Sequence, residues 1–169
     1  CALPPEFSPD GTPGDPAQQE RYDQLRIHLE TLAPDVVLAE YAPTGVALMD
    51  VCRDLSIPLV VKFHGYDSFL KPVVDKYRVG YDRLFGYASA VVAVSRHQAE
   101  TIIRLGVLPE KVHVIPTGVD TERFFGGAPD AAPPHFLSVG RFVDKKAPES
   151  VLLAFASVVE STREARLTM

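Results

Sequence analysis

The chain has 169 residues, of which 46% are hydrophobic and 23% charged, a balance typical of a globular protein with a core. Its net charge of −5 argues against a nucleic-acid partner, because phosphate binding needs a basic face. Two cysteines, Cys1 and Cys52, are too few for a disulfide scaffold or a cysteine-built zinc site, and they fit a reducing compartment. No apolar stretch reaches the ~20 residues that a membrane-spanning helix needs.

The first elements are a loop, a helix and a strand. Residues 1–15 are rich in proline, glycine and acidic residues, which is typical of a loop. Asp15 and Pro16 supply an N-cap and a proline at the first helical position, and apolar residues at helical spacing continue to Pro34. The continuous apolar run Val36–Ala39 then predicts a strand covered on both faces.

The middle of the chain repeats this alternation of helix and strand. Thr44 is expected to cap a helix that ends near Leu55. The next segment, Pro58–Phe63, has the apolar composition of a buried strand. A tyrosine-rich helix is expected around Tyr77–Tyr87, and a further strand at Ala90–Val94.

The following segment completes a βαβ pattern. Ser95 and Gln98 form a capping box in front of a helix that Gly106 ends. A strand at Val112–Ile115 comes next. Strands that alternate with helices in this way predict an α/β fold with βαβ units and a parallel sheet flanked by helices.

The composition changes at residues 126–134, where glycine, alanine and proline dominate. A new strand, His135–Val139, and a new helix, Pro148–Glu160, follow this segment. We therefore expect a first domain over residues 1–125, a linker over 126–134, and the first βα unit of a second domain over 135–169. The abrupt ends of the sequence suggest that it begins inside one domain and stops inside the next.

Common nucleotide and hydrolase signatures are absent from the sequence, so candidate chemistry lies in the turns that follow the strands. The first such turn places His64 directly after an apolar strand, with Gly65 allowing the backbone to turn. A histidine there suits a hydrogen bond with a hydroxyl-rich ligand. The alternative is a histidine that only satisfies a loop carbonyl.

The second turn delivers two cations in front of a helix. Arg141 follows the strand and Lys146 comes five residues later, just before Pro148 opens the helix. A guanidinium can bind phosphate oxygens through two parallel hydrogen bonds, and a helix N-terminus favours anions. By spacing alone, a solvated charge cluster on a loop explains these residues equally well.

Residues at the ends of the other predicted strands are better explained by structural roles than by chemical ones. Ser95 is better explained as an N-cap than as a nucleophile. Gly118 and Asp120 are ordinary turn residues, although Asp120 could face a cleft between domains. Glu40 and Tyr41 end the strand before the next helix, and a structural role is favoured for both.

Taken together, these segments resemble the retaining glycosyltransferases of family 4. The resemblance is carried by Ala90–Ser95, Val112–Phe124 and Ser138–Lys146, and it extends over most of the sequence, from Val36 to Phe155. It implies the GT-B architecture of two Rossmann-like domains that face a cleft, with an acceptor-side domain first and a donor-side domain second.

The resemblance also implies roles for individual residues. Arg141 and Lys146 would neutralise the diphosphate of a sugar nucleotide, and His64 would contact the donor sugar near the reacting carbon. No metal and no cofactor are expected, because no Asp-x-Asp pair is present to hold a metal on the diphosphate. Four further residues are candidates to line the cleft: Gly65, Asp67, Gly118 and Asp120.

One position departs from the family pattern. The family usually has glycine after the second lysine of the loop, whereas this sequence has Ala147 followed by Pro148. Alanine is expected to adopt a negative φ there, and proline to fix the start of the helix.

The resemblance implies transfer of a sugar from a nucleoside diphosphate sugar to a glycan or lipid-linked acceptor, with retention of configuration. The motif His-Gly-Tyr-Asp at His64–Asp67 is similar to that of enzymes of exopolysaccharide or colanic-acid assembly. We expect a cytoplasmic location with peripheral membrane association of the parent protein, and inactivity and self-association of the 169-residue chain alone. The alternatives are an inactive folded remnant and a GT-B sugar-nucleotide epimerase.

Overall fold

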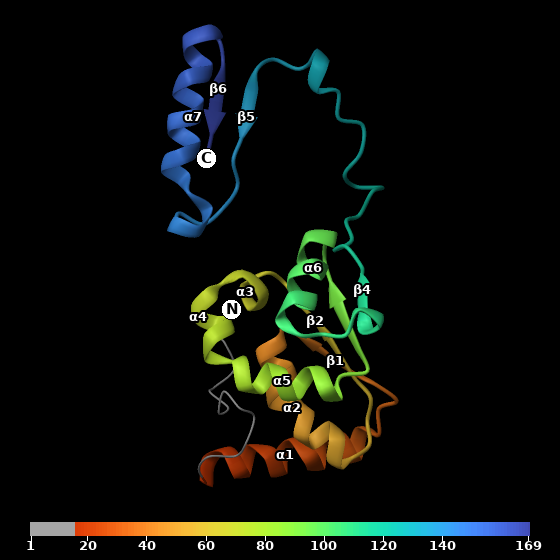
Figure 1. Cartoon of the computed structure of the whole chain (residues 1–169). Coiled ribbons are helices and arrows are strands. Elements are labelled where there is room, and N and C mark those ends of the chain that lie inside the picture. Colours follow the sequence, from red (N-terminus) through yellow and green to blue (C-terminus); the bar gives the residue numbers. More distant parts are fainter. Residues whose placement is uncertain (1–15) are drawn as a thin grey trace. The chain divides into compact units, whose positions relative to one another are not determined.

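The computed structural model describes residues 16–169, which form two compact units (Figure 1). The first unit ends at Gly118 and the second begins at Val119. The predictions for residues 1–15, including the N-cap at Asp15, lie outside the described residues.

The first unit is built on a four-stranded parallel sheet. Its strands are β1 (Val37–Glu40), β2 (Leu59–Lys62), β3 (Ala90–Ala93) and β4 (Val112–Val114), and they lie in the order β1-β2-β3-β4. Each strand pairs with the next one along the chain, so every connection is a crossover through helical segments. The predicted α/β fold with a parallel sheet is confirmed.

Helices occupy the connections between these strands. α2 packs against β1, β2 and α5, while α6 packs against β3 and β4, and α1 packs on α2 (Figure 1). The helical segments are α1 (Pro16–Leu32), α2 (Ala42–Asp54), α3 (Tyr66–Phe69), α4 (Lys71–Lys76), α5 (Arg78–Tyr87), α6 (Arg96–Leu105) and the short 3-10 helix η1 (Pro109–Lys111).

The hydrophobic core lies in this first unit. Within residues 16–169, the buried apolar side chains extend from Leu29 to Val107, and Tyr81 and Phe63 are the largest of those fully enclosed. Cys52 on α2 is fully buried, and burial raises the pKa of its thiol to about 11. The interpretation of Cys52 as a small hydrophobic residue is confirmed.

The ends of α6 follow the expected signals in part. Ser95 is the N-cap, and its Oγ accepts a hydrogen bond from the Gln98 backbone N–H at 3.1 Å. Gly106 ends the helix in a left-handed conformation, with φ of 118°. The side chain of Gln98 does not complete the capping box, because its Oε1 accepts from the backbone N–H of Val94 instead, at 2.7 Å.

Two expectations for the start of the chain are wrong. The run Val36–Ala39 is not covered on both faces, because Leu38 is 54% exposed on the edge strand β1. Thr44 does not cap α2, since that helix already begins at Ala42 with Tyr41 as the N-cap residue. Tyr41 makes no capping hydrogen bond with its side chain, and the N–H of Ala42 at the start of the helix donates instead to Asp67 Oδ2 at 3.0 Å.

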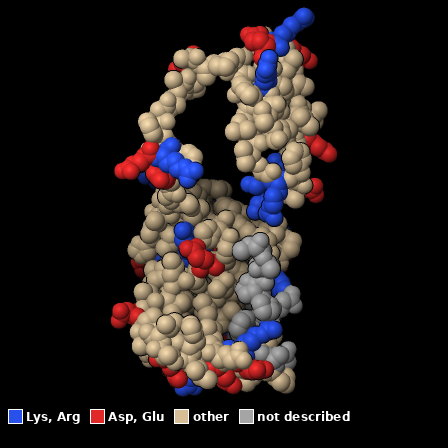
Figure 2. All heavy atoms as spheres, turned by 180° about the vertical axis from the view of Figure 1, so that it is seen from behind, with Lys and Arg blue, Asp and Glu red and all other residues tan. Residues whose placement is uncertain are grey.

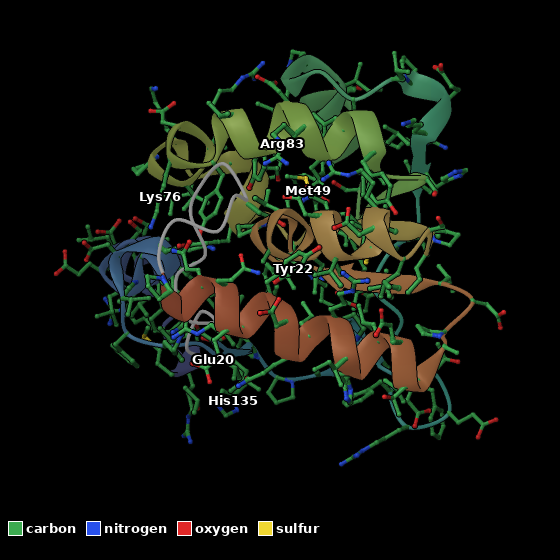
Figure 3. All side chains as sticks on the ribbon, turned by 90° about the horizontal axis from the view of Figure 1, so that it is seen from below. Glu20, Tyr22, Met49, Lys76, Arg83 and His135 are labelled. Carbon is green, nitrogen blue, oxygen red and sulfur yellow. The ribbon has the colours of Figure 1, made fainter. Side chains whose placement is uncertain are left out.

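Hydrogen bonds between side chains join α1 and α5 to α2. Arg83 of α5 donates to both carboxylate oxygens of Asp50 on α2, at 2.8 and 3.0 Å. The Tyr22 hydroxyl of α1 donates to the Asp54 carboxylate of α2. Figure 3 shows Tyr22 at the junction of α1 with α2, and Arg83 where α5 meets α2. This network ties α1 and α5 to α2.

Gly45 allows α2 to lie close to the sheet, and we expect Gly45→Val to lower the free energy of unfolding by about 1–3 kcal/mol. A Cβ at this position would lie 3.0 Å from Val61 Cγ2 and 3.1 Å from Leu84 Cδ2. The matched control is Gly86→Val, on the exposed side of α5, where a Cβ would meet nothing within 4 Å.

The measurement is urea denaturation followed by tyrosine fluorescence. All six tyrosines precede Gly118 and the chain has no tryptophan, so this signal reports the first unit alone. An equal loss of stability in both variants would contradict the close approach at Gly45.

The second unit contains a short parallel pair of strands and one long helix. His135 and Phe136 of β5 pair with Arg166 and Leu167 of β6. Phe136 also meets Phe155 of the helix edge-on, with ring centroids 5.9 Å apart. The elements of this unit are η2 (Pro129–Ala131), β5 (His135–Leu137), η3 (Asp144–Lys146), α7 (Pro148–Ser161) and β6 (Arg166–Thr168).

Candidate functional site

In the first unit, the candidate site lies where β1 and β2 end. His64 follows β2 and the buried Phe63, and its Nε2 is hydrogen-bonded to the Glu40 carboxylate at the end of β1. The ring of Tyr41 lies beside the imidazole, with centroids 4.6 Å apart. His64 therefore binds a carboxylate and contacts an aromatic ring, and no contact of its side chain with a loop carbonyl is found among the described residues; its contact with a hydroxyl-rich ligand stays a prediction.

The sheet register brings a lysine to the same place. Glu40 pairs with Lys62 across the parallel strands, and the Lys62 Nζ lies 3.9 Å from Glu40 Oε1. One oxygen of Glu40 thus meets the histidine and the other meets the lysine. The two strand ends together present a carboxylate, an imidazole and an ammonium group within one cluster of polar side chains.

Asp67 holds the backbone of this group. Its side chain is fully buried, its Oδ2 accepts a hydrogen bond from the Ala42 N–H and its Oδ1 accepts one from the His64 N–H, both at 3.0 Å. Burial raises the pKa of the Asp67 carboxyl, while these two amide hydrogen bonds act in the opposite direction. Gly65, with φ of 98°, makes the turn that brings Asp67 back to the His64 backbone.

Tyr41 has a strained backbone, with φ of 78° and ψ of 135°. A bulky residue rarely takes a positive φ, and such a conformation costs on the order of 1–3 kcal/mol. It is held on both sides, because Tyr41 donates from its N–H to the Lys62 carbonyl at 2.9 Å and accepts from the Gly45 N–H at 3.2 Å. Strain fixed in this way at a cluster of polar side chains is typical of a functional site.

In the second unit, the candidate site is the loop between β5 and α7. Arg141 and Lys146 line the same hollow of about 60 Å³, which also includes Gly140 and Pro148. A Cβ on Gly140 would lie 3.8 Å from Lys146 Cγ, so the aliphatic stem of the lysine lies along this glycine. The structure brings the two predicted cations together next to the start of α7.

Ala147 differs from the prediction. Its φ is 46° and its ψ is 53°, which is the left-handed region, and it is the N-cap residue of α7. The loop requires this conformation because the Ala147 N–H donates to the Asp144 carbonyl at 2.9 Å and its carbonyl accepts from the Val151 N–H at 3.2 Å. The expectation of a negative φ is wrong, since the geometry of the loop overrides the preference of alanine.

We expect Ala147→Gly to raise the free energy of unfolding of the second unit by about 1 kcal/mol, because glycine adopts a positive φ without steric cost. The comparison is Ala154→Gly, in the interior of α7, which should instead lower stability by a similar amount. Hydrogen exchange of the α7 amides measures both changes, since this unit lacks tyrosine. Equal effects of the two substitutions would contradict the role given to the left-handed residue.

The remaining sequence candidates, Gly118 and Asp120, lie in the exposed segment that follows β4. Gly118 is exposed and ends the first unit. Asp120 is exposed, and its Oδ1 accepts hydrogen bonds from the backbone N–H groups of Glu122 and Arg123, both at 3.1 Å. Its carboxylate therefore orders its own turn.

Positive and negative side chains are interspersed on the surface (Figure 2). On the face that Figure 2 shows, lysine and arginine side chains lie in small groups, several of them beside aspartate or glutamate. The residues that the structure describes contain no group of three or more His, Cys, Asp or Glu placed to hold a metal ion. Among the same residues, no helix combines the length and the apolar character that crossing a bilayer requires.

Sequence comparison relates the chain to enzymes of polysaccharide biosynthesis. Residues 4–123 match the family model named Glycosyltransferase Family 4. The amylovoran biosynthesis glycosyltransferase AmsK of Erwinia amylovora is 30% identical over 119 residues, which are 68% of this chain and 29% of that protein. WcaL of Salmonella typhimurium, named as a putative colanic acid biosynthesis glycosyltransferase, is 31% identical over 117 residues, 66% of this chain and 29% of WcaL. The chain thus spans less than a third of the length of these relatives.

Solved structures share the fold. HepE of Anabaena, crystallised with UDP, is similar with a TM-score of 0.67 at 19% identity, over 85% of this chain and 42% of HepE. A UDP-N-acetylglucosamine 2-epimerase is similar with a TM-score of 0.50 at 12% identity, over 89% of this chain and 43% of the epimerase. These likenesses support the predicted GT-B type of fold.

Sequence reasoning placed His64, Arg141 and Lys146 at strand ends but gave Glu40 and Tyr41 structural roles and passed over Lys62. A signal was available, because all three lie at the carboxyl ends of neighbouring parallel strands, where ligands bind. The family predicted from the motifs is confirmed by the match over residues 4–123. The chain belongs to glycosyltransferase family 4.

Proposed function

We propose that the full-length protein transfers a sugar from a nucleoside diphosphate sugar to a glycan or lipid-linked acceptor, with retention of configuration. The observation that carries this proposal is the hollow shared by Arg141 and Lys146 at the start of α7. Membership of the family and the similarity to AmsK and WcaL give its direction.

The electrostatics of the hollow suit a diphosphate. Arg141 can bind two phosphate oxygens with its planar guanidinium, while Lys146 adds a compact charge from a stem that lies along Gly140. α7 has 14 residues, and its N-terminus adds a favourable dipole beside them. During transfer, negative charge builds on the departing nucleotide, and the two cations would stabilise it. In this proposal they do the work that a divalent ion does in metal-dependent transferases.

His64 would contact the donor sugar near the reacting carbon. Its support is the geometry of the β1 and β2 ends, where the imidazole is bound to Glu40 and its backbone to Asp67. We also propose that residues 1–125 belong to an acceptor-side domain, 126–134 to a linker and 135–169 to the beginning of a donor-side domain. A cytoplasmic location, with peripheral association at the inner face of the membrane, fits an acceptor carried on a lipid.

The test is an assay of the full-length protein with UDP- and GDP-sugars and a lipid-linked glycan acceptor, with the products analysed by NMR. The expected result is transfer to the acceptor with the anomeric configuration of the donor retained. An inverted product would overturn retention. Epimerised donor without transfer would instead identify the protein as a sugar-nucleotide epimerase.

A second measurement concerns the 169-residue chain alone. Calorimetric titration with UDP- and GDP-sugars is expected to give no stoichiometric binding, because the chain spans 29% of its relatives' length. Clear one-to-one binding would contradict the view of the isolated chain as an inactive folded remnant.

A further inference from the structure

We propose that Glu40 is a positioning residue that keeps the hydrogen of the neutral His64 ring on Nε2, so that Nδ1 accepts a hydrogen bond from a hydroxyl group of a bound sugar. The proposal rests on the proposed function, because that function supplies the ligand for His64.

The hydrogen bond to Glu40 determines where the His64 ring carries its hydrogen. A carboxylate can only accept hydrogen bonds, so the Nε2 that meets Glu40 must carry the hydrogen. A neutral imidazole has one hydrogen on its two nitrogens, and Nδ1 is therefore left with a lone pair. The carboxylate thus decides which nitrogen of the ring donates and which accepts.

Neighbouring residues contact both Glu40 and His64. The second oxygen of Glu40 lies 3.9 Å from the Lys62 Nζ, so a positive charge lies beside the carboxylate. The ring of Tyr41 lies beside the imidazole at 4.6 Å, and Asp67 holds the backbone N–H of His64 at 3.0 Å. The side chain of His64 is still one-quarter exposed, so a ligand can reach the ring.

An Nδ1 atom that accepts a hydrogen bond would select ligand groups that can donate one. A sugar hydroxyl can donate a hydrogen bond to it, whereas a fully ionised phosphate oxygen has no hydrogen to donate. His64 would therefore recognise the hydroxyl-bearing part of the donor and not its diphosphate. Tyr41, whose ring lies beside the imidazole, has a strained φ of 78° and directly follows Glu40.

The test is ¹⁵N NMR of the 169-residue chain with labelled histidine at about pH 8, above the ordinary imidazole pKa of about 6.5. The chain has five histidines, and the His64 signals are assigned by their loss in His64→Gln. In the unsubstituted chain we expect the ring hydrogen on Nε2, with a visible proton signal because the carboxylate slows its exchange with water.

Substitutions of Glu40 separate positioning from general structural effects. Glu40→Gln should keep the Nε2 proton signal, because its side-chain oxygen still accepts, whereas Glu40→Leu should abolish it. The control is Glu30→Leu, which removes a carboxylate of matched exposure, 47% against 48%, and should leave the His64 signals unchanged. A ring hydrogen on Nδ1 in the unsubstituted chain, loss of the signal in Glu40→Gln, or its survival in Glu40→Leu would overturn the proposal.

A kinetic measurement on the full-length protein then separates this proposal from the proposed function. We expect Glu40→Leu to lower kcat for sugar transfer on the order of tenfold, and Glu40→Gln to restore most of it. Absence of any transfer by the unsubstituted protein would refute the proposed function, yet the NMR result would still decide the tautomer. Transfer that Glu40→Leu leaves unchanged would overturn the positioning role alone.

Discussion

Replacing Arg141 with alanine is expected to lower kcat/KM of the full-length protein for its sugar-nucleotide donor by about 10²–10³-fold, and Lys146→Ala should act in the same direction. Both side chains line one hollow at the start of α7, so each removal leaves negative charge on the departing diphosphate less well stabilised. Arg141→Lys should recover only part of the loss, because an ammonium cannot form the two parallel hydrogen bonds of a guanidinium.

The neighbouring lysine provides a matched control for these substitutions. Lys145 lies in the same short helix as Lys146, η3, but does not line the hollow with Arg141 and Lys146. Lys145→Ala should therefore change kcat/KM by less than about threefold, the size expected for one exposed charge. Initial rates at several donor concentrations separate kcat from KM. Donor kinetics that are unchanged in Arg141→Ala and Lys146→Ala would refute the assigned roles.

Asp67→Ala is expected to lower the free energy of unfolding of the first unit by about 2–5 kcal/mol. The substitution leaves the backbone N–H groups of Ala42 and His64 without their acceptor, and the former lies in the buried interior. Because total stabilities are often only about 5–15 kcal/mol, this loss should clearly lower the urea concentration at which the unit unfolds. Urea denaturation followed by tyrosine fluorescence measures the change.

Asp67→Asn provides a milder variant and a test of pH dependence. Asparagine has one oxygen, so one of the two amides would face an NH₂ group and stability should fall by about 1–3 kcal/mol. Because burial raises the pKa of Asp67, the folded chain holds that proton more tightly than the unfolded chain. The stabilising contribution of Asp67 should therefore decrease as the pH rises from the unfolded value through the folded one. A difference between the two proteins that grows over that range would contradict this sign.

The order of strands and helices could be predicted because apolar runs and capping residues are local signals. Ser95 and Gly106 bound α6 as expected, and each of the predicted strands is present. The exposure of Leu38 could not be predicted, because a continuous apolar run does not say whether a helix covers its second face. β6 was missed because three residues, two of them polar, carry no measurable periodicity.

The site was only partly predictable for a related reason. His64 and Arg141 stand out because each follows an apolar strand. The contact of His64 with Glu40 joins residues 24 positions apart, and only the parallel register of β1 and β2 brings them together. The left-handed Ala147 and the strained Tyr41 oppose residue preferences, and their conformations follow from hydrogen bonds to other residues of the chain.

The buried thiol of Cys52 allows openings of the first unit's core to be followed by the rate at which a thiol reagent alkylates it. Cys52 is a buried residue of α2, the helix that packs on β1 and β2. Burial raises the pKa of its thiol, so little of the reactive thiolate is present. With Cys1 changed to serine, a thiol reagent can modify the protein only when an opening of the core exposes Cys52. The alkylation rate therefore reports how often the core opens around the C-terminal part of α2, where Cys52 lies two residues before the end of the helix at Asp54.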